Sequence, residues 1–231
     1  MQRHKSRGES EPNLQFEKDY FSGRGYKNKE KIVKLNVLEV VKWASRVVGA
    51  DFSRGRGKRA LDVGCAYGYA SDVLGSFGYE TCGIDVSKWG VNQAKSNSLG
   101  DFIVCDAQTS LPFKAGSFDL VTCFDVLEHL QLPERTIRNM FESCSDALIC
   151  TTPNRTVEKP VRRIMRDFDE THISVKSPSE WENCIKDMTN PKLVKVEAFF
   201  DVTAKLANTR VLFKSVKVPN LGLTVRILVR K

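Results

Sequence analysis

Hydrophobic residues along this chain alternate between short apolar runs and stretches in which they recur at helical spacing. The short runs predict strands at residues 60–63, 81–86, 102–105, 118–124 and 147–151. The helical stretches lie at residues 28–49, 69–78, 86–98 and 133–145. Strands that alternate with helices predict a parallel sheet with right-handed crossovers.

The pattern loosens after residue 154, where the chain becomes rich in Lys and Arg. Residues 155–171 predict a lid or a short helix, and residues 179–188 predict a further helix. We expect strands at 193–200 and 223–229, and the stretch 211–218 is a weaker strand candidate.

This pattern also predicts how the chain divides. We expect a flexible basic arm at 1–27 and a single domain at 28–231. Within that domain, the regular alternation covers about 59–154, and the residues at about 154–180 form a variable segment.

Residues 59–71 read RALDVGCAYGYAS and join a predicted strand to a predicted helix. Gly64, Ala66 and Gly68 remove side-chain bulk where the backbone turns, so a ligand can approach the main chain closely. In a parallel sheet this turn lies in the crevice outside the carboxyl ends of the strands, where ligands bind. A purely structural turn would also contain such small residues.

A dinucleotide site is one interpretation of this turn, and the sequence argues against it. The G-x-G-x-x-G fingerprint, counted from Gly64, needs glycine at positions 66 and 69, where the chain has Ala66 and Tyr69. Asp62 would also repel the pyrophosphate group that such a site binds. An oxidoreductase is therefore the least favoured enzyme class.

Acidic residues also follow or end the next three apolar runs. Asp85 stands roughly 20 residues after Gly64, a distance that suits hydrogen bonds to ribose hydroxyls. Asp106 and Asp125 follow the third and fourth runs. A single Asp at a strand end is commonly a cap or turn residue. Three of them, together with Asp62 and the glycine turn, favour one crevice lined from several strand ends.

Residues 62–68 resemble the first motif of the class I S-adenosylmethionine-dependent methyltransferases, (D/E)-x-G-x-G-x-G. Asp62, Gly64 and Gly68 match this motif, and Ala66 replaces its middle glycine. Residues 111–113 and 116–119 are similar to the small-molecule, type 11-like branch of that family, and the resemblance covers about residues 20–181. It implies a doubly wound, Rossmann-like α/β fold with a seven-stranded, mostly parallel sheet, helices on both faces and an antiparallel C-terminal strand.

The resemblance implies S-adenosyl-L-methionine as the cofactor and S-adenosyl-L-homocysteine as the product. The cofactor-binding residues that it implies are Asp62, Gly64, Cys65, Ala66 and Gly68 at the methionine moiety, Asp85 and Val86 at the ribose, Asp106 and Ala107 at the adenine, and Phe124 and Asp125 along the pocket wall. Asp125 either holds the cofactor amino group or caps the turn after it. The aromatic residues at 20–26 either pack over the cofactor or staple the next helix.

Two of the three histidines are candidate catalytic bases. Methyl transfer from a sulfonium mainly needs orientation and proximity, and an oxygen or nitrogen nucleophile can also need a base. His129 follows the fourth strand, and His172 ends the variable segment. The resemblance places similar histidines near the substrate pocket of some quinone-modifying O-methyltransferases. The alternative for both is a structural, hydrogen-bonded residue.

The resemblance makes the residues at about 59–154 the cofactor half, and those at about 154–180 a variable substrate or lid segment. The net charge of +8 is unevenly placed, with the acidic cofactor half between two basic ends. Basic ends that fold together could attract nucleic acid, an anionic membrane or a phosphorylated small substrate, or they could merely be solvated. The arginines that favour an anionic acceptor are Arg155, Arg162, Arg163 and Arg166.

Three functions follow from these observations. The first is methyl transfer to an oxygen, nitrogen or carbon of a metabolite, lipid precursor or glycan. The second is RNA methylation, which the residues 124–127, FDVL, disfavour, because nucleic-acid amino-methylating enzymes commonly have (N/D)-P-P-(Y/F) there. The third is a non-catalytic protein of the same fold that binds a partner through its basic ends.

The seven cysteines contain no C-x-x-C pair, so the sequence predicts no zinc or iron–sulfur site and no metal cofactor. Buried, free cysteines suit a reducing cytosol. The chain has no apolar run long enough for a transmembrane helix, and residues 1–13 lack the apolar core of a secretory signal. We therefore expect a cytoplasmic protein.

Overall fold

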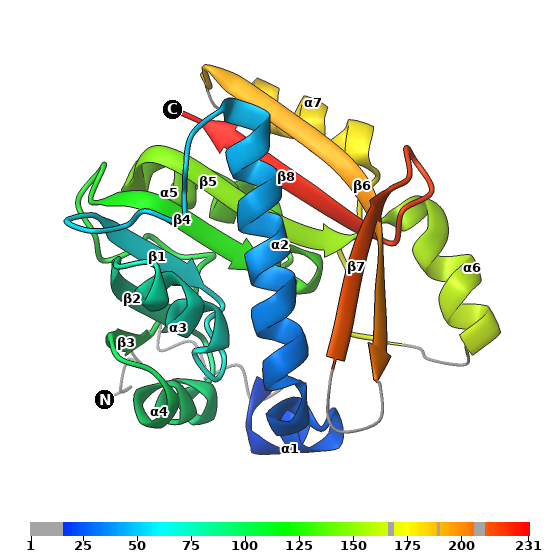
Figure 1. The fold of residues 1–231 in the computed structure, drawn as a ribbon, viewed down its shortest axis with the longest axis horizontal. Coiled ribbons are helices and arrows are strands. Elements are labelled where there is room, and N and C mark those ends of the chain that lie inside the picture. Colours follow the sequence, from blue (N-terminus) through cyan, green and yellow to red (C-terminus); the bar gives the residue numbers. More distant parts are fainter. Residues whose placement is uncertain (1–15, 166–168, 189, 206–210) are drawn as a thin grey trace, which may run out of the picture.

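Eight strands form a single sheet in the order β3-β2-β1-β4-β5-β8-β6-β7 (Figure 1). The computed structural model describes residues 16–165, 169–188, 190–205 and 211–231. The strands are β1 (Arg59–Val63), β2 (Glu80–Asp85), β3 (Asp101–Val104), β4 (Phe118–Phe124), β5 (Cys144–Pro153), β6 (Leu193–Lys205), β7 (Val211–Lys217) and β8 (Thr224–Arg230).

Helices cover both faces of this sheet, as the sequence predicts. They are α1 (Lys18–Gly23), α2 (Glu30–Val48), α3 (Tyr69–Ser76), α4 (Lys88–Asn97), α5 (Pro133–Ser143), α6 (Arg155–Met165) and α7 (Pro178–Met188). Two 3₁₀ turns, η2 (Tyr26–Lys29) and η3 (Leu127–His129), precede α2 and follow β4. Figure 1 shows α2 running along one face of the sheet, with α5 and α7 on the opposite face.

The first five strands are parallel, which confirms the expected α/β architecture. Helices α3, α4 and α5 follow β1, β2 and β4, and each returns the chain so that the next strand can run in the same direction. The carboxyl ends of β1 to β4 therefore meet at one edge of the sheet. This edge is where the predicted crevice lies.

The sheet has eight strands, so the expected number of seven is wrong. β6 extends to Lys205, five residues beyond its predicted end at Phe200, and β7 pairs with this extension in antiparallel register from Lys205↔Val211 to Phe199↔Lys217. β8 lies between β5 and β6 and is antiparallel to both. The C-terminal part of the sheet is therefore a three-stranded antiparallel unit, in which β7 was only a weak candidate from sequence.

Side chains of β1 alternate between two hydrophobic cores. Leu61 and Val63 pack with α5 and α7, where Trp181 is fully buried. Ala60 faces the opposite way and packs with α2 and α3, where Ala44 and Leu74 are fully buried. This two-residue period is the reason that Asp62, although it lies in the same strand, faces α3 rather than α5.

Within the expected basic arm at 1–27, the structure describes the residues from 16 onward. α1 lies in this part and η2 begins at its end, and Phe21 is buried among Tyr67, Tyr69 and Tyr26. Burial of these aromatic rings offsets the loss of chain entropy that would otherwise favour a disordered arm. Residues 1–15 lie outside the described residues. Among the residues that the structure describes, no helix has the length and apolar character that a membrane span requires.

Candidate active site

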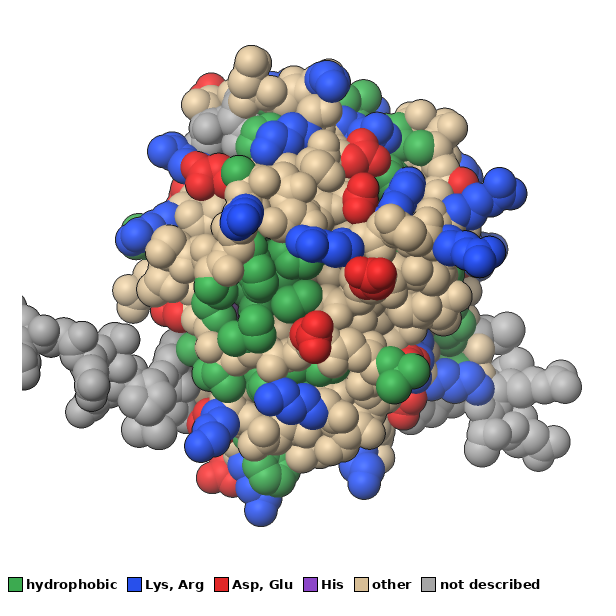
Figure 2. Space-filling model, turned by 90° about the vertical axis from the view of Figure 1, so that its left-hand side faces the viewer, with side chains coloured by type: hydrophobic (Ala, Val, Ile, Leu, Met, Phe, Trp, Pro, Cys, Tyr) green, Lys and Arg blue, Asp and Glu red, His purple; other side chains and the backbone are tan. Residues whose placement is uncertain are grey.

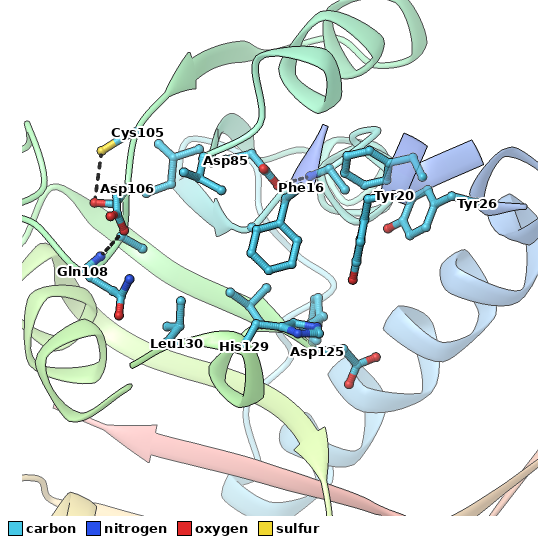
Figure 3. Close-up of a pocket in the computed structure, with 18 residues that line it drawn as sticks. Phe16, Tyr20, Tyr26, Asp85, Cys105, Asp106, Gln108, Asp125, His129 and Leu130 are labelled. Atoms are coloured by element: carbon cyan, nitrogen blue, oxygen red, sulfur yellow. Dashed lines mark hydrogen bonds between the residues drawn. The ribbon is translucent and has the colours of Figure 1, made fainter. Parts of the chain in front are cut away.

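A pocket opens at the carboxyl ends of β1 to β4, where the glycine turn and three of the strand-end acids meet (Figure 3). Its lining residues are Phe16, Tyr20, Phe21, Tyr26, Gly64, Ala66, Ile84, Asp85, Val86, Cys105, Asp106, Ala107, Gln108, Phe124, Asp125, Val126, His129 and Leu130. Most of the residues predicted from sequence are among them. The four that are not are Asp62, Cys65, Gly68 and His172.

Asp85 fixes the turn after β1. Its Oδ2 accepts a hydrogen bond from the N–H of Ala66 at 2.8 Å, and its Oδ1 accepts one from the N–H of Ser87 at 2.8 Å. Ala66 has a φ of +47°, a conformation that costs more for alanine than for glycine. The carboxylate of Asp85 therefore stabilises a strained turn, and its burial raises its pKa. The predicted contact with ribose would use the remaining lone pairs of the same oxygens.

Asp62 supports the turn from behind and is not part of the pocket wall. Its side chain is fully buried, its Oδ2 accepts a hydrogen bond from Ser71 Oγ at 2.7 Å, and its Oδ1 accepts one from Thr122 Oγ1 at 3.2 Å. Burial raises the pKa of Asp62 to about 6. The carboxylate thus joins β1 to α3 and β4, and it would affect a ligand through the position of the turn.

Cys65 and Gly68 lie on the side of the turn that faces α4. Cys65 is buried and packs with Val91, Ala94 and Phe102. Gly68 has a φ of +78°, and a Cβ at this position would lie 3.1 Å from the Cβ of Ala94. Both residues therefore shape the turn. Neither lines the pocket, so their position does not by itself support the predicted contacts with the methionine moiety.

Gly64 lines the pocket at the turn after β1. Its φ is +77°, and a Cβ at this position would lie only 2.2 Å from Cγ2 of Val126. Its N–H donates a hydrogen bond to the carbonyl of Ile84 at 2.8 Å, so the turn is held against β2. Glycine is required here both for its backbone conformation and for its lack of a side chain.

Asp106 and Gln108 form one end of the pocket (Figure 3). Asp106 Oδ1 accepts a hydrogen bond from the N–H of Gln108 at 2.9 Å, and Ala107 lines the pocket between them. The Oε1 of Gln108 accepts hydrogen bonds from the N–H groups of Gln131 and Leu132 at 2.9 and 3.0 Å. Gln108 ties two loops together, a role that no motif in the sequence indicates.

The end of β4 forms the opposite wall. Phe124, Asp125 and Val126 all line it, and Asp125 has a φ of +54°, in the left-handed region. Its Oδ1 accepts a hydrogen bond from Thr151 Oγ1 at 2.9 Å, and burial raises the pKa of its carboxyl group. Asp125 therefore presents an acidic group that is exposed in the pocket.

Four aromatic side chains from the N-terminal segment cover the pocket, so the interpretation in which this segment packs over the site fits the structure. Phe16, Tyr20, Phe21 and Tyr26 line it, and the ring of Phe16 lies 5.5 Å from that of His129 between centroids. Figure 3 shows Phe16 between the Asp106 end and the Asp125 end. The sequence predicted a role for the aromatic residues at 20–26, but not for Phe16.

An ion pair ties this cover to the variable segment. Arg24 donates hydrogen bonds to both carboxylate oxygens of Asp169, at 2.5 and 2.8 Å, and its guanidinium lies 4.3 Å from the ring centre of Tyr20. Although burial opposes it, these hydrogen bonds and those from Thr171 hold the pKa of Asp169 well below its usual range. Residues far apart in the sequence therefore meet at the pocket entrance.

His129 lines the pocket beside Asp125, as Figure 3 shows. Its Nδ1 lies 3.1 Å from the carbonyl oxygen of Thr171 and 2.9 Å from Thr171 Oγ1, whose own proton is donated to Asp169. Both oxygens can only accept, so we assign the proton to Nδ1 and the lone pair to Nε2. Burial, reinforced by nearby His172, lowers the pKa of His129 to about 4. The ring is therefore neutral near pH 7.

His172 lies behind His129 and does not line the pocket. The two ring centres are 4.8 Å apart. Nδ1 of His172 is hydrogen-bonded to Glu158 Oε1, and its Nε2 lies 3.3 Å from Asp169 Oδ2. Only His129 of the two predicted bases is therefore placed to reach a bound molecule directly. His172 acts on the pocket through its neighbours.

The expectation of an anionic acceptor rests on four arginines, and the described part of the chain gives this expectation little support. Arg155 pairs with Glu180 at the surface. The side chains of Arg162 and Arg163, and all of Arg166, lie outside the described residues. What does border the pocket near His129 is acidic, namely Asp125 with Glu128 behind it.

Comparison with known proteins gives the same picture as the geometry. Residues 39–188 match the family model of a methyltransferase domain. A ubiquinone biosynthesis O-methyltransferase from Marinobacter nauticus is 31% identical over 143 residues, which cover 56% of this chain and 58% of the relative. One from Burkholderia vietnamiensis is 38% identical over 82 residues, which cover 33% and 35%. The matches thus span less than two thirds of either relative.

Solved structures match over more of the chain. A methyltransferase from Thermotoga maritima, described as a possible histamine N-methyltransferase, has a TM-score of 0.68 at 16% identity and covers 92% of this chain and 97% of its own. Magnesium protoporphyrin IX methyltransferase from Synechocystis, with S-adenosylhomocysteine bound, has a TM-score of 0.60 at 18% identity and covers 92% and 97%. These structures share the fold. Together with the family match, they show that the chain belongs to the class I S-adenosylmethionine-dependent methyltransferases.

Proposed function

We propose that this protein transfers the methyl group of S-adenosyl-L-methionine to a small molecule. The observation that carries the proposal is the set of groups around one pocket: Asp106, Asp85, the glycine turn and Asp125 follow one another along the carboxyl ends of β3, β2, β1 and β4. This acidic set suits a cofactor that has a sulfonium and an amino group and no phosphate. It would disfavour a dinucleotide.

Each residue has a distinct task in this proposal. Asp85 would accept hydrogen bonds from the ribose hydroxyls, and Asp106 with Ala107 would border the adenine. Asp125 would attract the amino group, and Phe124 would pack along the methionine chain. When bound, the cofactor supplies an electrophilic methyl group and a neutral thioether leaving group. The protein contributes by orienting the acceptor and by excluding water with the N-terminal aromatic cover.

The acceptor would enter beside His129. Its unprotonated Nε2 can take a proton from an acceptor hydroxyl, and removal of such a base typically costs 10²- to 10⁴-fold in rate, on the order of magnitude known for general-base catalysis. Phe16 and Tyr20 favour a flat, apolar acceptor. The two curated relatives are O-methyltransferases, which favours oxygen as the acceptor atom.

Calorimetric titration with S-adenosylhomocysteine tests the cofactor, with NAD as the control ligand. We expect micromolar binding of the first and none of the second. Asp85→Asn should weaken S-adenosylhomocysteine by about 10- to 100-fold, the loss typical of a hydrogen bond to a charged group. Asp101→Asn is the matched control, because Asp101 is exposed at the opposite end of β3.

Two results would contradict the proposal. Equal affinity in the Asp85→Asn and Asp101→Asn variants would remove the ribose assignment. If neither S-adenosylhomocysteine nor NAD bound to the folded protein, the non-catalytic interpretation would replace methyl transfer.

A further inference from the structure

Three side chains capable of binding a metal ion meet at the wall of the pocket. Glu128 and His129 belong to η3, directly after β4, and His172 comes from the segment that precedes α7. Their ligand atoms lie within 4.8 Å of one another. Ligand atoms around a tetrahedral zinc ion are about 3.4 Å apart, given metal–ligand bonds of about 2.1 Å. A shift of about 1 Å in these side chains would therefore close the cluster around an ion.

The outer nitrogen of each imidazole is supported as it is in known metal sites. His129 directs Nδ1 at the carbonyl oxygen of Thr171, and His172 directs Nδ1 at the carboxylate of Glu158. A metal-binding histidine almost always donates its second N–H to a carbonyl or carboxylate, which fixes the tautomer and orients the ring. With Nδ1 engaged on both rings, Nε2 is the nitrogen that each would offer to an ion. Nε2 of His172 also lies 3.3 Å from Oδ2 of Asp169, so an ion bound there would take the place of this contact.

The cluster is also held together by the backbone. The N–H groups of Ile173 and Ser174 both donate hydrogen bonds to the carbonyl oxygen of Glu128, each at 2.9 Å. These bonds fix the segment that contains His172 against η3. Glu128 itself is 1% exposed, and its Oε2 accepts a hydrogen bond from Thr152 Oγ1 at 3.1 Å. These hydrogen bonds therefore anchor His172, which lies in the loop before α7, to η3.

Four carboxyl groups gather around this point. The side chains of Glu128, Glu158 and Asp169 are buried, and Asp125 is exposed in the pocket. Arg24 is paired with Asp169, and His172 contacts both Glu158 and Asp169. Buried carboxylates are costly unless they are paired or bind a metal. A divalent cation among Glu128, His129 and His172 would offset this cost. It would also allow an oxygen-rich or anionic acceptor to approach a wall that would otherwise repel it.

The donor set selects among cations. One carboxylate and two imidazoles suit zinc and neighbouring transition metals, whereas magnesium and calcium prefer oxygen ligands. Three protein ligands leave a fourth position of a tetrahedral ion open, as in catalytic zinc sites. Because His129 lines the pocket, that position would face a bound molecule.

We propose that Glu128, His129 and His172 form a binding site for a zinc-type divalent cation, with its open position directed into the pocket. No metal site was predicted from the sequence, because that prediction rested on the absence of cysteine pairs. The ligands found here come from two segments, and their spacing along the chain has no recognisable pattern.

The catalytic use of this ion rests on the proposed function. An acceptor hydroxyl at the open position would lose its proton to water more easily. Its oxygen would then form a bond to the methyl carbon while the carbon–sulfur bond breaks and the sulfur keeps the bonding pair. The ion would take the place of a protein base, and Nε2 of His129 would serve as a ligand.

Titration of the chelator-treated protein with Co²⁺, followed by visible absorption, tests the site directly, and Zn²⁺ calorimetry measures the affinity. We expect one equivalent of Co²⁺ to give ligand-field bands without the near-ultraviolet charge transfer of cysteine ligands. His172→Ala and Glu128→Gln should abolish this spectrum. Glu158→Gln should weaken Zn²⁺ by about 10- to 100-fold, the usual effect of losing such a supporting carboxylate.

Cys184→Ser is the matched control, because Cys184 is a half-buried thiol away from the cluster that could bind these metals adventitiously. Its spectrum should equal that of the unsubstituted protein. The proposal is overturned if no equivalent of Co²⁺ binds, or if His172→Ala, shown to be folded by its thermal transition, binds Co²⁺ and Zn²⁺ unchanged. S-adenosylhomocysteine titration is a separate readout. Metal binding without cofactor binding would keep this site and reject the proposed function, and the converse would do the opposite.

Discussion

Ala66 and Asp125 both line the pocket with positive φ, at +47° and +54°. Such a conformation costs about 1–3 kcal/mol for a residue other than glycine. The hydrogen bond from Ala66 to Asp85 and that from Thr151 to Asp125 hold the two residues in place. Strain is thus concentrated where the backbone must approach a ligand. The neighbouring Gly64 has no strain of this kind because it is glycine.

Gly64→Ala should destabilise the protein by about 2–5 kcal/mol. About 1–2 kcal/mol comes from the left-handed backbone of an L-residue, and about 1–3 kcal/mol comes from the overlap with Val126. Gly57→Ala is the control, since Gly57 has a φ of +75° and a Cβ there meets nothing within 4 Å. Urea unfolding of both variants measures the difference. Equal losses would show that Val126 moves aside without cost.

Asp62 makes the free energy of unfolding depend on pH. Burial raises its pKa from 3.8 to about 6 in the folded protein. The folded state therefore keeps a proton that the unfolded state releases, so stability falls as the pH rises from about 4 to 6 and stays low above that range. The total loss is about 3 kcal/mol, at about 1.4 kcal/mol for each pKa unit.

Asp62→Asn should remove this dependence, because its side chain is neutral at every pH. We expect the stability of the Asn variant relative to the unsubstituted protein to increase by about 2.4 kcal/mol between pH 4 and pH 7. Chemical unfolding without cofactor, repeated at several pH values, measures it. Any constant effect of the altered hydrogen bonds to Ser71 and Thr122 cancels in that comparison. Two parallel stability curves would mean that Asp62 ionises normally.

The C-terminal strands are joined by a buried cation. Arg226 of β8 is 1% exposed, and it donates hydrogen bonds to Asp201 Oδ1 on β6 at 2.8 Å and to Ser215 Oγ on β7 at 2.6 Å. Its guanidinium also lies 4.0 Å from the ring centre of Phe199. β6 and β7 extend past β8 here, so a long side chain from β8 can reach both.

Arg226→Met should cost about 3–5 kcal/mol, because it leaves the partly buried carboxylate of Asp201 without its cation. The control is Arg230→Met in the same strand. Arg230 pairs with Asp146, and both side chains are partly exposed, so its loss should cost less than about 1 kcal/mol. Denaturant unfolding distinguishes the two. If Arg226→Met and Arg230→Met were equally stable, the buried pair would contribute nothing net to joining these strands.

At the level of elements, the sequence predicted what depends on local periodicity. The strands ending near Asp85 and Phe124 and the helix at Pro133 lie where expected, because their apolar positions face a core. β7 was weakly predicted because its stability depends on pairing with β6, which no local pattern encodes.

The same reasoning explains the site. Strand ends predicted that Asp85, Asp106 and Asp125 lie together, and all three line one pocket, since parallel strands bring their carboxyl ends together. Asp62 does not line this pocket, because its position in β1 points it at α3. The neighbours of His172, among them Glu158, could not be predicted, because they meet only through tertiary packing.

Over the whole molecule, ion pairs join the basic ends of the chain to its acidic middle. Lys34 pairs with Asp72 at 2.8 Å, Lys176 with Glu134 at 2.9 Å, and Arg230 with Asp146 at 2.5 Å. The net charge is nevertheless +8, so these pairs offset only part of the basic charge. Figure 2 shows both signs of charge interspersed around a hydrophobic area on one face of the molecule, and that face lacks the uniformly positive surface that nucleic-acid binding would need.

The residues that line the pocket come from many parts of the chain, from Phe16 to Leu130. The ion pair of Arg24 and Asp169 joins the variable segment to them. A ligand that binds this pocket binds only the folded state. S-adenosylhomocysteine at 100 times its dissociation constant should therefore stabilise the protein by about 2.7 kcal/mol. For a chain of this size, that corresponds to a rise of about 5–10 °C in Tm.

The N-terminal cover should contribute to this rise. Phe16→Ala removes a ring from the pocket, so at the same ligand concentration we expect a smaller increase in Tm, measured by calorimetric or fluorescence melting. Phe200→Ala is the control, because Phe200 is an exposed phenylalanine on β6 that does not line the pocket. Its increase should match that of the unsubstituted protein. An undiminished rise in Phe16→Ala would mean that Phe16 packs against the pocket without contacting the ligand, and that the cover acts only on the acceptor.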